Sequence, residues 1–126
     1  MIRKDFIQRY FDELANVLAV VMNLKNNLKP VEAEAKISDF ANDFLKISFE
    51  EILAIETDLI EFLKEEKAFT FDHFKILEDL LYHKYLLNPT DTYLKKNTLE
   101  VLNYVSKNDT NYSFERMSRL KELDSK

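Results

Sequence analysis

The residues best suited to chemistry in this chain are its two histidines. Asp79 and His83 stand four residues apart, so on a helix their side chains would share one face and could meet. A metal site needs further ligands, and no second histidine or Glu-x-x-His motif supplies them. The pair therefore predicts an exposed histidine that is stabilised by a neighbouring charge, and His73 is expected to face solvent.

Two pairs of carboxylates offer a second route to chemistry. Asp39 and Asp43 stand one helical turn apart, as do Glu61 and Glu65. If such a pair were buried, its members could share a proton. Nothing in the sequence indicates burial, so we expect exposed pairs whose repulsion costs a little stability. A small hydrolase-like or metal-binding enzyme that uses His83 with carboxylates remains an alternative hypothesis.

The residue types that are missing exclude several classes of site. The 126 residues include no glycine and no cysteine. Phosphate-binding loops and nucleophile elbows need glycine, because the backbone must turn sharply or approach an anion closely. Without cysteine there is no disulfide, thiolate nucleophile or cysteine-ligated metal. We therefore assign no catalytic, cofactor-binding or metal-ligating residue, expect no cofactor, and expect the protein not to be an enzyme.

The charge distribution argues against nucleic acid as a partner. The net charge is −5; residues 1–63 carry 7 basic and 12 acidic side chains, and residues 64–126 carry 11 of each. Nucleic-acid binders usually show a basic excess. The alternative would combine basic and tyrosine residues of the C-terminal helices, among which acidic residues are interspersed. Its candidates are Lys95, Lys96, Lys107, Arg116, Arg119 and Lys121, with Tyr93, Tyr104 and Tyr112.

The elements that carry all these residues are predicted to be helices, and the first long one organises the rest. No glycine or proline interrupts residues 5–28, where apolar residues recur at steps of three and four. The resulting stripe predicts a core-facing central helix of about 36 Å. Its members are Ile7, Tyr10, Phe11, Leu14, Val17, Leu18, Val21, Leu24 and Leu28.

Five further helices are predicted from start signals and apolar periodicity. Pro30 opens the second, and Ser48 with Glu51 forms a capping box at the start of the third. Thr70 and Ser113 are expected to cap the fourth and the last. The fourth is apolar on several sides, so it is either buried by neighbours or kept for a partner. The predicted ranges are 30–46, 48–65, 70–88, 92–107 and 114–123, the last facing inward with Phe114, Met117, Leu120 and Leu123.

Helix ends must manage without glycine, which commonly adopts the left-handed conformation there. Asparagine tolerates that conformation, so we expect asparagines to take over the role. The candidates are Asn26, Asn27, Asn88, Asn108 and Asn111.

The chain is predicted to be one domain, residues 1–126, because no linker of biased composition divides it. No uncharged apolar run approaches the ~20 residues that span a bilayer. The first residues lack the apolar region of a secretory signal. A cytoplasmic protein is therefore expected.

A resemblance to a known family supports the helical class. Residues 1–9, followed by Leu14-Ala15 and Leu18-Ala19, resemble the opening of an uncharacterised family of short bacterial proteins. In that family a long first helix precedes a helical pair similar to a tetratricopeptide repeat. Residues 29–47 resemble the second half of such a unit, with Ala33 as its small packing residue. The resemblance implies a helical fold and brings no assigned activity.

These observations predict an all-α domain of five or six helices. The helices would form an antiparallel, tetratricopeptide-like array or an irregular bundle around the long N-terminal helix. The predicted function is a non-enzymatic interaction or adaptor module for a protein partner or for a second copy of itself. A membrane, a nucleic acid and a small-molecule substrate are not expected as partners.

Overall fold

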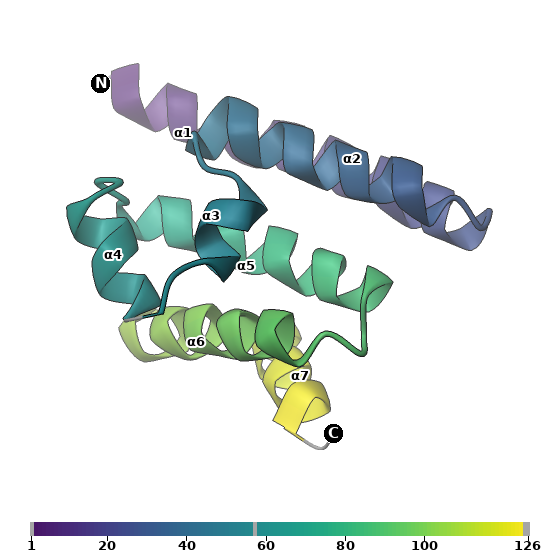
Figure 1. Ribbon diagram of the computed structural model, residues 1–126. Coiled ribbons are helices and arrows are strands. Elements are labelled where there is room, and N and C mark those ends of the chain that lie inside the picture. The colour runs from purple at the N-terminus through teal and green to yellow at the C-terminus, as the bar shows by residue number, and fades with distance from the viewer. Residues whose placement is uncertain (1, 57, 125–126) are drawn as a thin grey trace.

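A computed structural model describes residues 2–56 and 58–124, with side chains from residue 8 onward, so the predicted inward position of Ile7 lies outside the described residues. The described residues form seven α-helices and one π-helical segment, with no β-strand, which confirms the predicted all-helical class (Figure 1). The elements are α1 (Ile2–Asn26), α2 (Pro30–Phe40), η1 (Ala41–Leu45), α3 (Phe49–Leu53), α4 (Leu59–Glu65), α5 (Phe71–Leu87), α6 (Thr92–Asn108) and α7 (Phe114–Asp124).

The predicted third helix, 48–65, is split into α3 and α4, which accounts for the helix beyond the six ranges predicted. Asp58 caps α4, because its side chain accepts a hydrogen bond from the Glu61 amide at 3.2 Å. Aspartate favours such a cap over a helix interior. The hydroxyl of Tyr93 donates to the carbonyl oxygen of Ile55 at 3.0 Å, which satisfies a backbone group between the two helices. The prediction of one continuous helix was wrong.

Helix α5, and not the N-terminal helix, is the element around which the others pack. It contacts α1, α2, η1 and α6, and Figure 1 shows it between the α1–α2 hairpin and α6. Phe74, Leu77 and Leu81 are among its fully buried residues. The prediction that helices pack around residues 5–28 was therefore wrong. A helix that is apolar on several sides is buried by neighbours, whereas a one-sided stripe covers one face of the core.

The stripe of α1 faces the core for most of its length. Leu14 and Val21 are buried, and Val17 is half-buried against the same core. Leu28 breaks the pattern, since its side chain is 87% exposed. The helix ends at Asn26, and Leu28 adopts a left-handed conformation with φ of 59°, so it no longer follows the helical period.

Helix ends replace glycine in two ways. In the part of the chain that the structure describes, left-handed backbone occurs at Leu28, Lys46 and Ala68. None of these is asparagine, so that prediction was wrong. Asparagines contribute through their side chains instead. The Nδ2 groups of Asn27, Asn88 and Asn108 each donate to the carbonyl oxygen four residues earlier, at 2.8 to 3.1 Å. The Asn23 carbonyl also accepts from the backbone amide of Asn27 at 3.0 Å, so there the side chain adds a second hydrogen bond at the helix end.

The predicted starts of α2, α3, α5 and α7 are confirmed, whereas α1 begins at Ile2, before the predicted start near residue 5. Pro30 begins α2, and the capping box forms, with Ser48 Oγ accepting from the Glu51 amide at 3.1 Å. Thr70 precedes α5, and Ser113 Oγ accepts from the Arg116 amide at 3.1 Å. Start signals are reliable because they depend on local geometry alone.

Candidate functional site

Helix α7 turns two arginines inward and leaves its aromatic residue in solvent. Arg116 and Arg119 are buried with Leu120 and Leu123. Phe114 is 80% exposed and Met117 is also exposed, so the prediction that both face the core was wrong. Residues nine apart point to opposite sides of a helix, about 180° around its axis, so Phe114 and Leu123 could not both be buried there. The arginines and leucines follow an i, i+3, i+4, i+7 spacing, which keeps them on one face.

The inward arginines meet two adjacent carboxylates on α5. Arg116 donates from Nε to Glu78 Oε1 at 2.7 Å and from Nη2 to Oε2 at 2.9 Å. It also donates to Asp109 at 3.3 Å. The pKa of Glu78 is raised, because the effect of burial outweighs that of the arginine, which lowers it. The hydrogen bonds to Glu78 in turn raise the pKa of Arg116. Two parallel hydrogen bonds of this kind are a strong and directional ion pair.

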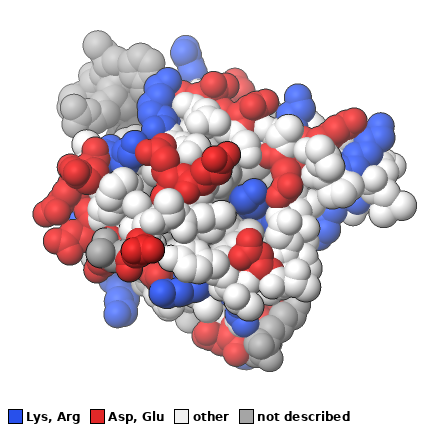
Figure 2. All heavy atoms as spheres, in the orientation of Figure 1, with Lys and Arg blue, Asp and Glu red and all other residues white. Residues whose placement is uncertain are grey.

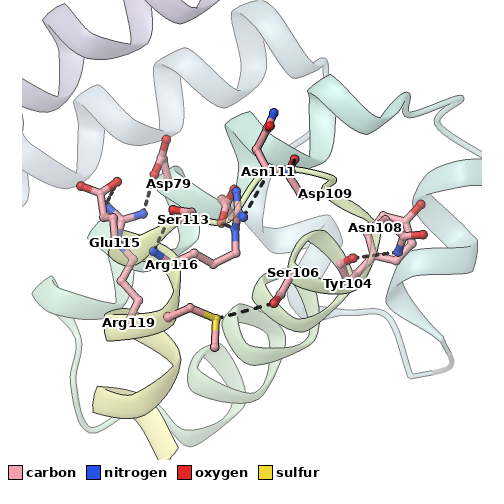
Figure 3. Close-up of polar contacts among 12 residues, drawn as sticks. Asp79, Tyr104, Ser106, Asn108, Asp109, Asn111, Ser113, Glu115, Arg116 and Arg119 are labelled. Atoms are coloured by element: carbon pink, nitrogen blue, oxygen red, sulfur yellow. Dashed lines mark hydrogen bonds and ion pairs between the residues drawn. The ribbon is translucent and has the colours of Figure 1, made fainter.

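The second arginine binds the neighbouring carboxylate and a tyrosine ring. Arg119 donates to Asp79, and its Nη2 lies 3.4 Å from Glu115 Oε1. Figure 3 shows both carboxylates beside α7. Its guanidinium carbon lies 4.3 Å from the ring centre of Tyr82. The Tyr82 hydroxyl donates to Glu122 at 2.8 Å; burial and this hydrogen bond raise the pKa of Tyr82 to about 12. We call Glu78, Asp79, Arg116 and Arg119 the α5–α7 ionic cluster.

The structure does not bring Asp79 and His83 together as a charged pair. His83 is only 8% exposed, and burial followed by the nearby Arg119 lowers its pKa to about 4. The prediction of an exposed histidine stabilised by charge was wrong, because Asp79 bonds to Arg119 instead. His83 is therefore neutral at pH 7.

The other histidine has a structural role at the start of α5. His73 is half-buried, and its Nδ1 accepts a hydrogen bond from the Thr70 amide at 2.9 Å. Burial lowers its pKa. The prediction that His73 faces solvent was wrong, because the ring occupies the position of the acidic residue in a capping box.

A small polar cavity of about 120 Å³ adjoins the ionic cluster. Its walls come from α1, α5 and the start of α7, and its charged groups include all four members of the cluster. At roughly 30 Å³ for each water molecule, it has room for a few waters. Since the carboxylates and guanidiniums bind one another, the arrangement holds α7 in place and leaves them poorly suited to acid–base chemistry.

The predicted carboxylate pairs lie apart from this cavity. Asp39, Asp43, Glu61 and Glu65 are all exposed, as expected. Among the side chains of residues 8–56 and 58–124, no three histidine or carboxylate groups gather in a way that could hold a metal ion. In the same part of the chain, no helix has the length and apolarity to cross a membrane.

The basic and tyrosine residues proposed for nucleic acid do not all reach the surface. Arg116 and Arg119 are buried against carboxylates. Tyr104 is half-buried, with its ring 4.7 Å from that of Phe74. On the face shown in Figure 2, positive and negative side chains alternate. The two arginines are therefore unavailable to phosphates.

Among the side chains that the structure describes, the most exposed aromatic ones lie together where α6 leads into α7. Tyr112 is 71% exposed, and its ring centre lies 5.2 Å from that of Phe114 in an edge-to-face arrangement. Ser106 donates to the sulfur of Met117, one turn further along α7. We call these rings the Tyr112–Phe114 pair. Sequence reasoning missed it because an aromatic residue at a helix start was assumed to be core.

Other exposed apolar residues lie on α1 and at the turn between α1 and α2. Leu28 and Val31 flank the turn between α1 and α2, while Val20 and Met22 lie on α1. Two residues apart, Val20 and Met22 point about 200° away from each other around the helix axis. Val20 and Met22 therefore cannot form one surface. Leu28 and Val31 are aliphatic, whereas aromatic side chains are enriched at interfaces, so the Tyr112–Phe114 pair is the better candidate for a binding site.

Comparison of the chain with models of protein families, with curated proteins and with solved structures finds no match.

Proposed function

We propose that this protein is a non-enzymatic interaction module that binds a protein partner through the Tyr112–Phe114 pair. The observation that carries the proposal is the 71% and 80% exposure of two aromatic rings in mutual contact. Aromatic residues are enriched at the centres of protein interfaces, where they contribute much of the binding energy. Because both rings are exposed, a partner that buried them would gain this binding energy.

The pair is held in place before any partner arrives. Asp109 accepts a hydrogen bond from the Asn111 amide at 3.0 Å and forms an ion pair with Arg116. Ser113 caps α7 directly before Phe114. These contacts fix the loop on which Tyr112 stands. Because the rings are already ordered, binding loses less conformational entropy than it would with a flexible loop.

The strength of the expected contact can be estimated from the rings alone. Burying one large apolar side chain contributes about 1.5–3 kcal/mol. Removal of both rings should therefore weaken binding by at least about 100-fold. Met117, three residues after Phe114 and also exposed, extends the surface along α7.

The proposal includes the tetratricopeptide-like array and the cytoplasmic location expected from the sequence. Support for the array comes from the neighbouring pairs α1–α2 and α5–α6, which are in contact and run antiparallel in Figure 1. Helical hairpins stacked in this way present side chains from successive helices to a partner. The resemblance to a family of short bacterial proteins stays a prediction.

The test compares three immobilised proteins. They are the wild type, the Tyr112→Ala/Phe114→Ala variant, and a Leu28→Ala/Val31→Ala variant that removes the same number of exposed apolar side chains elsewhere. Each is exposed to extract of cells that make the protein, and sedimentation of the pure chains measures self-association. The proposal expects the wild type and the matched control to retain the same partner and the aromatic variant to lose it. Equal retention by all three, or a wild type that is monomeric and retains nothing, would overturn it.

A further inference from the structure

The rings of the Tyr112–Phe114 pair form a corner with two aromatic walls. Their centres lie 5.2 Å apart and their planes meet at 87°. Because the residues are 71% and 80% exposed, both rings offer surface to a ligand. A flat and rigid apolar group can stack on one ring while its edge meets the other.

The charged groups of the neighbouring turn are already paired within the chain. Asp109 lies 3.3 Å from Arg116, and Glu115 lies 3.4 Å from Arg119. Arg116 is also bound to the buried Glu78. A cationic ligand would have to compete with these arginines for the carboxylates, and an anionic ligand with the carboxylates for the arginines. The corner therefore favours a ligand that is neutral where it binds.

Two neutral hydrogen-bonding groups beside the rings are available to such a ligand. The side chains of Asn111 and Tyr112 are exposed, and neither forms a hydrogen bond with another residue that the structure describes. The hydrogen bond of Asn111 to Asp109 uses its backbone amide alone. A carboxamide and a phenol can both donate, so they suit a ligand that is rich in carbonyl acceptors.

A proline-rich peptide in the polyproline II conformation meets both requirements. Its backbone makes no internal hydrogen bonds, so its carbonyl oxygens remain available to donors. The proline ring is apolar and rigid, and it loses almost no side-chain entropy when it is buried, unlike leucine or methionine. The small area of two rings can therefore hold it, because the peptide is ordered before it binds.

We propose that the Tyr112–Phe114 pair binds a proline-rich segment of its protein partner in the polyproline II conformation. A proline ring occupies the corner between the two rings, and the Tyr112 hydroxyl and the Asn111 side-chain amide donate to carbonyl oxygens of the segment. The inference rests on the proposed function, since it names the kind of partner that the same surface takes. The rival occupant is the surface of a folded protein.

Titration of the pure full-length chain with a decaproline peptide, followed by NMR of the backbone amides, tests the proposal. Saturable shifts should appear within residues 110–117, and a glycine–serine peptide of equal length should cause none. Tyr112→Ala/Phe114→Ala should raise the Kd for decaproline at least about tenfold, whereas Leu28→Ala/Val31→Ala should leave it unchanged. Absence of shifts in the wild type, or an equal Kd in the aromatic variant, overturns the proposal.

Two milder variants test the assigned donors. Tyr112→Phe removes the hydroxyl and keeps the ring, and Asn111→Ala removes the side-chain amide. Each should weaken decaproline binding by roughly twofold to tenfold, the usual range for one hydrogen bond. Asn16→Ala, which removes an exposed amide from α1, should have no effect. Unchanged binding in both Tyr112→Phe and Asn111→Ala overturns the assigned hydrogen bonds.

Competition separates this inference from the proposed function. Decaproline in excess should release the partner that the immobilised wild type retains through its aromatic rings. If the partner is retained through the rings but decaproline neither binds nor releases it, the proline-rich segment is overturned and the proposed function stands. If decaproline binds at the rings and the wild type retains no protein, the ligand chemistry stands and the proposed function fails.

Discussion

The buried pair between Glu78 and Arg116 makes the clearest stability prediction. Arg116→Met removes the guanidinium but keeps much of the aliphatic length. Glu78, only 4% exposed, then loses both hydrogen bonds and its counter-charge. Breaking one side of a buried ion pair typically costs about 3–5 kcal/mol. For a chain of 126 residues, that loss corresponds to a melting temperature roughly 10–20 °C lower.

The same variant should show a distinctive dependence on pH. Burial raises the pKa of Glu78, and without Arg116 nothing in the pair opposes that effect. A carboxyl group whose native pKa lies above its unfolded value binds more protons when folded, so acid stabilises the native state through it. The penalty of Arg116→Met should therefore shrink as the pH falls from about 7 towards 5, as Glu78 takes up a proton.

Urea unfolding followed by far-ultraviolet circular dichroism measures these differences. Glu78→Leu/Arg116→Met replaces the whole pair by apolar side chains and should unfold within about 1 kcal/mol of the wild type, or be more stable. Lys121→Met removes an exposed cation from the same helix and should change stability by less than about 0.5 kcal/mol. If Arg116→Met costs less than about 1 kcal/mol at pH 7, the pair is not buried as described.

Three further predictions test the core, a histidine and a turn. The pKa of His83 is lowered from 6.5 to about 4 in the folded chain. Between these two pH values the unfolded state binds more protons than the folded state. The free energy of unfolding should therefore decrease as the pH falls from about 6.5 to about 4, by up to about 3 kcal/mol. Melting curves of the wild type and His83→Gln between about pH 7 and 4.5 check this, and an imidazole that titrates near 6.5 by NMR contradicts it. Val21→Asp should unfold the domain or lower its free energy of unfolding by several kcal/mol, because Val21 is buried. Val17→Asp should lower it less, because Val17 is half-buried, and Val20→Asp should hardly change it, because Val20 is exposed. Urea unfolding measures each difference. Leu28→Gly should raise stability by about 1 kcal/mol, because leucine pays a steric cost at φ of 59°, and a lower melting temperature would refute that reading.

Local signals in the sequence predicted most of the helix boundaries. Ser48 and Ser113 cap helices as expected, because a cap depends on residues within one turn of it. The missed break at Asp58 carries the same kind of signal, with Glu61 three residues later. It was overlooked because apolar periodicity continues through the break, with Ile52, Leu59 and Leu63 all buried.

The candidate site could not be predicted from apolar periodicity. Tertiary contacts set the rotation of α7, since Glu78 and Asp79 lie on a helix distant in sequence. Charged residues were expected to face solvent, so Phe114 was predicted in the core and Arg116 on the surface. The structure shows the reverse. The predicted pairing of His83 with Asp79 failed for the same reason, because Arg119 of α7 binds that aspartate.

Hydrogen exchange with and without the captured partner tests the central claim most directly. If the Tyr112–Phe114 pair is the binding surface, amide protection should increase within residues 110–117 and leave the α1–α2 turn unchanged. Protection confined to residues 20–31, or no change at 110–117 when the partner is bound, would contradict the claim.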